Sequence, residues 1–147
     1  MTRYEHTQIG HWVIWALLGA SALVWIGPIS HGSPPLGSSL VLPTVFVIGI
    51  ALFYKLTINV NDQVLCASFG IGLIRKKAPL AEIVRCEPIR IRWWYGWGIH
   101  LTPHGWLYNV SGLDAVAITL RNGRRFALGS DDPDGLATAI RRFSSVA

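Results

Sequence analysis

The sequence predicts an α+β membrane protein, in which a two-helix transmembrane hairpin precedes a small antiparallel β-sheet or barrel of about seven strands capped by a C-terminal α-helix. Hydrophobic residues make up 51% of the 147 residues and charged residues only 14%, whereas about 25% are charged in a typical soluble domain. The first 55 residues contain three charged side chains, Arg3, Glu5 and Lys55. We therefore expect two parts: residues 1–55, a tail and hairpin, and residues 56–147, a separate domain.

Two apolar runs are the predicted membrane helices. Residues 7–30 contain no fully charged side chain, and about 20 apolar helical residues suffice to cross the hydrocarbon core of a bilayer. Residues 39–56 form a shorter run, and the connector between the runs is rich in Gly, Pro and Ser. Aromatic and basic residues favour the membrane interface. The residues expected to anchor the helices there are Trp12, Trp25, Tyr54 and Lys55.

The distribution of positive charge predicts the orientation. Lys and Arg are absent from the connector but present at Arg3, at Lys55 and in residues 75–77. We therefore expect both termini and the C-terminal domain in the cytoplasm, where Cys66 and Cys86 stay reduced. Two alternatives remain: core helices of a soluble protein, or a cleaved signal peptide, although no A-x-A cleavage site follows the first run.

In the remaining 92 residues, apolar and polar residues alternate in short runs, as is typical of β-strands. Leu56, Ile58 and Val60 share one face of the first predicted strand. Asn122-Gly123 is the pair favoured in a two-residue type I′ hairpin turn. Residues 132–143 read as an amphipathic helix, with Asp132 at its N-cap and apolar side chains on one stripe.

Four stretches carry a family resemblance: FGIGLIRKKAPLAEIVRCEPI, GWGIHLTPHGWLYNV, DAVAITLRNGRRFALGSDDP and GLATAIRRF. Together, over residues 56–143, they resemble the bacterial pleckstrin-homology-like (PH-like) domains that follow one or more membrane helices. The resemblance implies a binding or assembly module without catalysis, located at a bacterial inner membrane. Phosphoinositide-binding relatives carry basic residues at the first strand turn, which here contains Asp62 and no Lys or Arg. Head-group specificity of that kind is therefore not expected.

The stretch RIRWWYGWGIH has the aromatic and basic composition of a surface that meets a membrane or a partner. The alternative is that members such as Trp94 and Ile99 fill the core. The basic run at residues 75–77 either meets an acidic surface or protects a strand edge by its charge. The candidate interface residues are Arg90, Arg92, Trp93, Trp94, Tyr95, Trp97, Arg75, Lys76 and Lys77.

Catalytic, metal and nucleic-acid sites have weaker support. His100 and His104 have metal-ligand spacing only on a helix, and Pro103 argues for a strand and turn. Ser111, Asp114 and His104 lack the context of a nucleophile motif. The net charge of +5 is dispersed and no nucleic-acid motif is present. We predict no catalytic residue, metal or cofactor.

The function expected from the sequence is a membrane-anchored, non-catalytic interaction module, an accessory subunit that docks another integral membrane protein or itself. The alternative is a module that binds anionic lipid, through basic residues that each add about 1 kcal/mol near such a surface. A more distant alternative is a catalytic or cofactor-binding membrane subunit built around His11 or His100.

Overall fold

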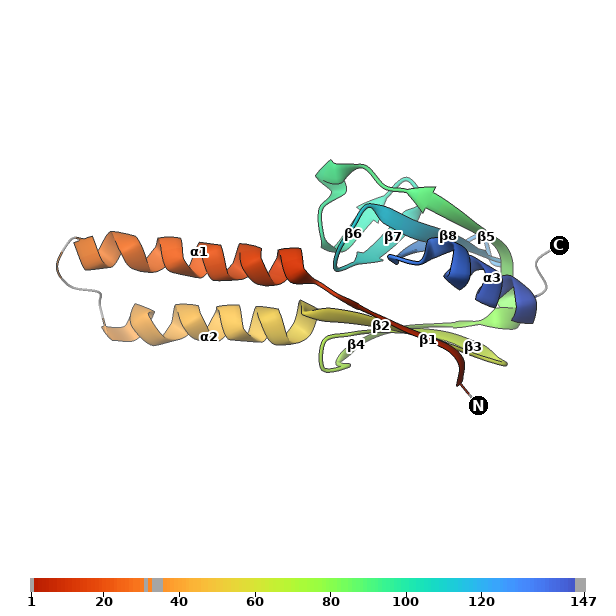
Figure 1. Cartoon of the computed structure of the whole chain (residues 1–147), viewed down its shortest axis with the longest axis horizontal. Helices are drawn as coiled ribbons and strands as arrows, with labels where there is room; N and C mark the ends of the chain where they lie inside the picture. The colour runs from red at the N-terminus through yellow and green to blue at the C-terminus, as the bar shows by residue number, and fades with distance from the viewer. Residues whose placement is uncertain (1, 31, 33–35, 145–147) are drawn as a thin grey trace.

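A computed structural model describes residues 2–30, 32 and 36–144. This part of the chain contains two β-sheets, of four and five strands, and three α-helices. Helices α1 (His11–Ser30) and α2 (Leu36–Phe53) lie side by side and extend from one end of the β-sheet body, and the last helix ends toward the opposite end (Figure 1).

The first sheet is antiparallel and includes residues from before and after the helix pair. Its strand order is β1 (Thr2–Ile9), β2 (Lys55–Asn61), β3 (Val64–Phe69) and β4 (Ile74–Pro79). The pairing of β1 with β2 begins next to the helices, where Ile9 lies opposite Lys55, and continues to Thr2 opposite Asn61. Alternate residues of β2 and β3 are buried, as expected for a sheet with one face in the core.

The second sheet has a mixed topology. Its strand order is β5 (Ile83–Arg90), β8 (Asp114–Leu120), β9 (Arg125–Gly129), β7 (Gly105–Asn109) and β6 (Gly98–Thr102). Strands β7 and β9 are parallel, whereas the other neighbours are antiparallel. The short helix η1 (Leu80–Glu82) joins the two sheets, and η2 (Trp93–Tyr95) follows β5.

Helix α3 (Pro133–Phe143) covers one part of this body. The Asp132 carboxylate accepts a hydrogen bond from the Gly135 N–H at 3.0 Å and so caps the helix. Leu136, Ala137 and Ile140 are its buried residues. The apolar face of the helix therefore closes over the core.

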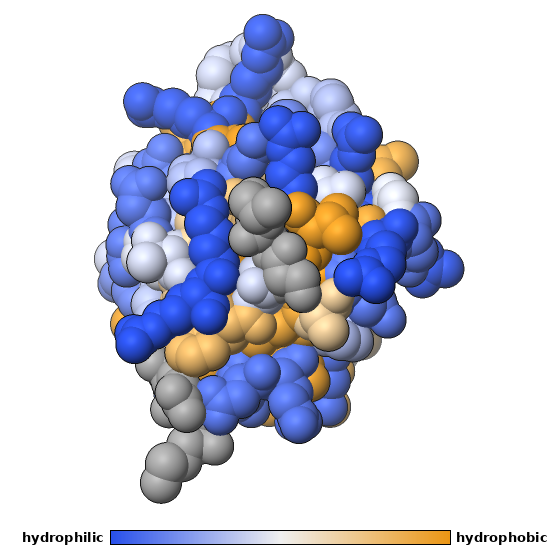
Figure 2. Space-filling view, turned by 90° about the vertical axis from the view of Figure 1, so that its right-hand side faces the viewer, coloured by the Kyte–Doolittle hydropathy of each residue, from blue (hydrophilic) through white to orange (hydrophobic). Residues whose placement is uncertain are grey.

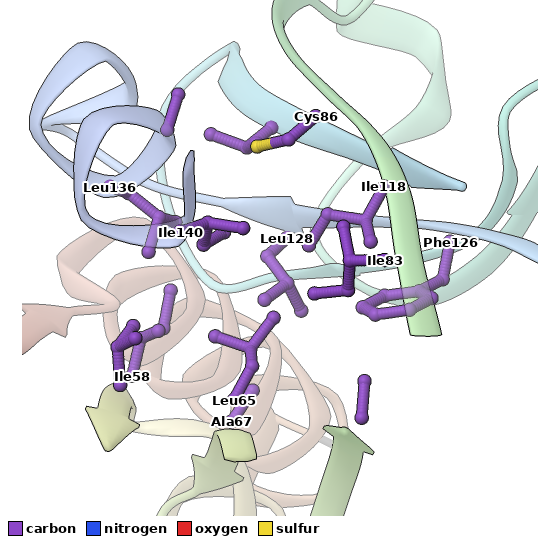
Figure 3. Packing of buried hydrophobic residues seen from close by; sticks show 14 of the residues in the cluster. Ile58, Leu65, Ala67, Ile83, Cys86, Ile118, Phe126, Leu128, Leu136 and Ile140 are labelled. Atoms are coloured by element: carbon purple, nitrogen blue, oxygen red, sulfur yellow. The ribbon is translucent and has the colours of Figure 1, made fainter. Parts of the chain in front are cut away.

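The core lies between the two sheets and under α3. Side chains from both sheets and from the helix point toward one another in Figure 3. They include Ile58, Leu65, Ile118, Leu128 and Ile140, each no more than 2% exposed. This shared core fixes the two sheets relative to each other.

The predicted transmembrane hairpin is wrong. Within the described residues, no helix combines the length and the apolar character needed to cross a membrane. Helix α2 has 18 residues, and about 20 apolar residues are typical of a span. Helix α1 has 20 residues, and the polar side chains of His11 and Ser21 are among them.

The predicted PH-like domain behind two membrane helices, with about seven strands in one sheet or barrel, is also wrong. The structure has two separate sheets. The first of them begins with β1, which precedes the helices in sequence and was not foreseen. The predicted boundary after residue 55 separates β1 from its partner strand β2.

Candidate docking surface

The helix pair presents apolar side chains to its surroundings. The helices contain no Lys, Arg, Asp or Glu, and they contact each other where Gly49 faces Leu17. The exposed large apolar residues are Trp12, Trp15, Leu18, Leu23, Val24 and Ile26 on α1, and Val41, Leu42, Val45, Val47 and Ile48 on α2. By contrast, the end of the body farthest from the helices is largely hydrophilic, with small apolar patches (Figure 2).

The aromatic stretch forms an exposed loop after β5. Trp93 is 75% exposed, Trp94 is 55% exposed and Trp97 is 40% exposed. The Gly96 N–H donates to the Trp93 carbonyl oxygen at 3.2 Å, which closes the short helix η2. Trp94 therefore does not fill the core, and the Arg92 guanidinium lies 4.7 Å from its ring centroid. Of this segment, Tyr95 is half-buried against a small apolar cluster.

A ring contact joins this loop to the first helix. Trp12 and Trp97 stack with their ring centroids 6.1 Å apart and their planes at 6°. Nearby, the Gly10 N–H donates to the Tyr54 carbonyl oxygen at 2.8 Å. The term docking surface is used below for two sets of side chains together: the exposed apolar side chains of α1 and α2, and Trp93, Trp94 and Trp97. Its helical and loop parts are thus held together.

The predicted basic run does not form one patch. Arg75 and Lys77 are exposed on β4, whereas the Lys76 ammonium lies 5.2 Å from the centroid of the Phe126 ring. The alternation of the strand is the cause, because neighbouring side chains point to opposite faces. Arg90 is exposed at the end of β5.

Three of the four predicted anchor residues lie at the ends of the helices that adjoin the β-sheets. Tyr54 follows α2, and the Lys55 ammonium lies 5.3 Å from the centroid of its ring. Trp12 stands at the start of α1. Trp25 belongs to α1, but its side chain lies outside the part of the structure that is described.

Several exposed apolar residues were not foreseen from the sequence. Ile71 and Leu73 lie in the turn between β3 and β4, and Leu101 lies opposite Trp106 on β6 and β7. Apolar side chains that alternate with two turn glycines, as in GIGL, were the available signal for the first pair.

The structure does not assemble the catalytic candidates. His104 lines a hollow beside Arg85 and Glu87, whereas Ser111 and Asp114 line a different hollow beside β1. The His100 imidazole Nε2 is in hydrogen-bond contact with the Trp97 carbonyl oxygen. Among the described residues, no three His, Cys, Asp or Glu side chains are grouped as metal ligands would be.

The two cysteines should react at very different rates. Burial raises the pKa of the Cys86 thiol to about 11, although the nearby Arg141 opposes this effect. Cys66 is only half-buried. We expect a thiol-specific reagent at neutral pH to modify Cys66 at least about 100-fold faster than Cys86. Labelling kinetics of Cys66→Ser, with Cys86→Ser as the control, measure this; a fast phase that survives in Cys66→Ser would contradict it.

In comparisons with known proteins, no family model, no curated protein and no solved structure matches this chain.

Proposed function

We propose that this protein is a non-catalytic interaction module, an accessory subunit that docks an apolar surface of a protein partner through the docking surface. The observation that carries the proposal is the continuity of the uncharged helix pair with the exposed tryptophan loop through the Trp12–Trp97 stack. Large exposed apolar patches are typical of interaction sites.

The chemistry of the docking surface defines the kind of partner. Burial of apolar area contributes about 25 cal/mol per Å², and tryptophans are frequent among the residues that dominate binding energy. Charge pairing has little to contribute along the helices, because they contain no Lys, Arg, Asp or Glu. The partner is therefore expected to offer an apolar groove or helix face, and the complex should resist salt.

Purification of the tagged full-length protein from its native cells in a gentle detergent tests the proposal. We expect a stoichiometric protein companion, identified by mass. Trp15→Glu should lower its recovery about tenfold or more, because the substitution places a charge on the exposed apolar face of α1. Trp106→Glu is the matched control, since Trp106 is similarly exposed but lies on β7.

Two outcomes would overturn this function. One is a companion whose recovery does not depend on Trp15. The other is a chain without a companion that binds phosphatidylglycerol vesicles and loses this binding in the Arg75→Glu/Lys77→Glu double variant. That result would replace protein docking by anionic-lipid binding through β4. Location at a bacterial inner membrane stays a prediction, which cell fractionation in the same experiment would test.

A further inference from the structure

We propose that the free edge of β1 binds an extended, basic segment of a partner protein by β-strand addition. This site is separate from the docking surface and goes beyond the function proposed above. Strands β1 and β4 are the two edges of the four-stranded sheet. An unpaired edge offers a row of backbone donors and acceptors to another chain.

The register shows which backbone groups of β1 are available. The Gly10 N–H donates to the Tyr54 carbonyl oxygen. In an antiparallel pair, the residues that face the partner strand alternate with residues whose N–H and C=O point away from it. Tyr4, His6 and Gln8 lie an even number of residues from Gly10, so their backbone N–H and C=O groups face β2. The backbone groups of Glu5, Thr7 and Ile9 therefore point to the free edge, and no other described strand pairs with them.

Side-chain contacts hold β1 in place for such a role. The Tyr4 hydroxyl donates to the Asp132 carboxylate at 3.3 Å, and the Gln8 amide donates to the Ser111 carbonyl oxygen at 2.8 Å. Burial, assisted by Asp132, raises the pKa of Tyr4 to about 12, so the phenol keeps its proton. His6 contacts Asp131. The edge is thus ordered before binding, which lowers the entropy cost of adding a strand.

Two hollows flank this edge. One, of about 670 Å³, lies between Tyr4 on β1 and Thr138 and Arg142 on α3. The other, of about 420 Å³, lies beside Thr7 and Ile9 and is also lined by Asp114 and Asp131. Side chains of an added strand that point toward the second sheet would enter these hollows.

The charges beside the edge select a basic segment. Five of the eight acidic residues of the chain lie on β1, at the start of β8 or around the N-terminus of α3, against two arginines, Arg3 on β1 and Arg142 beside the first hollow. The five acidic residues are Glu5, Asp114, Asp131, Asp132 and Asp134. By contrast, β4 carries exposed Arg75 and Lys77. A basic segment is therefore attracted to the β1 edge and repelled from the β4 edge.

The test uses the full-length protein and a fluorescently labelled peptide of alternating lysine and valine, with an alternating glutamate and valine peptide as the control. Fluorescence anisotropy should show binding of the lysine peptide that weakens with salt. Thr7→Pro should weaken it about tenfold, because the variant removes an outward N–H and leaves a peptide carbonyl unpaired. Lys77→Pro is the matched control, since the β3–β4 register places its N–H at the other free edge.

A second variant keeps the test decisive if Thr7→Pro unfolds. Asp114→Asn leaves the backbone unchanged and should weaken binding of the lysine peptide about threefold or more at low salt, whereas Glu82→Gln on η1 should not. Equal binding of both peptides, or no binding of either, would overturn the proposal. So would self-association of the chain that Thr7→Pro abolishes while the lysine peptide does not bind, because a second copy would then be the occupant of this edge.

Discussion

Gly70→Ala is expected to lower the free energy of unfolding by about 3 kcal/mol or more. Gly70 has a φ of +50°, and a Cβ there would lie 2.1 Å from the carbonyl oxygen of Ala51 and 2.5 Å from that of Leu52. Those oxygens belong to the last turn of α2. Relief of the clash would separate the β3–β4 turn from the helix and break the bond from the Ile71 N–H to the Ala51 oxygen. Denaturant unfolding of the full chain measures the loss.

Gly123→Ala measures the cost of a positive φ alone, without the clash that occurs at Gly70. Gly123 also has a positive φ, +80°, but nothing lies within 4 Å of a Cβ at that position. Its substitution should therefore cost only about 1–2 kcal/mol. Equal losses for the two variants would show that the junction between α2 and the first sheet does not depend on this close approach.

Leu128→Ala is expected to destabilise the fold by about 2–5 kcal/mol. Leu128 on β9 is fully buried and points into the core between the two sheets (Figure 3). Truncation removes apolar contacts and leaves a cavity that the surrounding strands cannot close without moving. The midpoint of denaturant unfolding should fall, with little change in the slope of the transition.

Leu73→Ala is the matched control for this variant. It makes the same chemical change at a side chain that is 73% exposed, in the turn between β3 and β4. We expect an effect within about 0.5 kcal/mol. A loss at Leu128 as small as the loss at Leu73 would contradict the packing described for the core.

Local patterns in the sequence predicted local structure well. Leu56, Ile58 and Val60, which alternate in the sequence, are all buried on β2. Helix α3 begins at Pro133 with Asp132 as its cap, as the sequence predicted. Both results depend on the periodicity or capping chemistry of a few neighbouring residues, which a sequence displays directly.

The turn at Asn122-Gly123 shows where local prediction was less accurate. Both residues lie between β8 and β9 as expected, but β8 ends at Leu120 and β9 begins at Arg125, so the connection is longer than two residues. Of the pair, only Gly123 has a positive φ, so the predicted type I′ turn is wrong. The Gly123 N–H donates to the Leu120 carbonyl oxygen, and the Asn122 side chain accepts from the Arg124 N–H. In this wider loop, the Asn122 side chain thus satisfies a backbone N–H. The preference of Asn-Gly for type I′ turns does not take such a side-chain bond into account.

Long-range features could not be predicted from the sequence. Strand β1 carries Tyr4, His6 and Gln8 on its inward face, so its apolar signal is weak, and its partner β2 lies beyond two helices. The parallel pairing of β7 with β9 likewise joins segments that are not consecutive. The sequence indicated the aromatic stretch as a candidate surface. Its contact with Trp12 could not be predicted, because that contact joins segments that are far apart in the sequence.

The bond between Gly10 and Tyr54 also makes the helix pair an insertion within a β-hairpin, because α1 begins just after β1, α2 ends just before β2, and these two strands are neighbours. At 1.5 Å per residue, the 20 residues of α1 extend about 30 Å from that point. A partner held by the helices and a strand held by the edge of β1 would lie along one continuous segment, formed by β1 and α1. The protein would then act as a spacer that sets both the distance and the angle between the two.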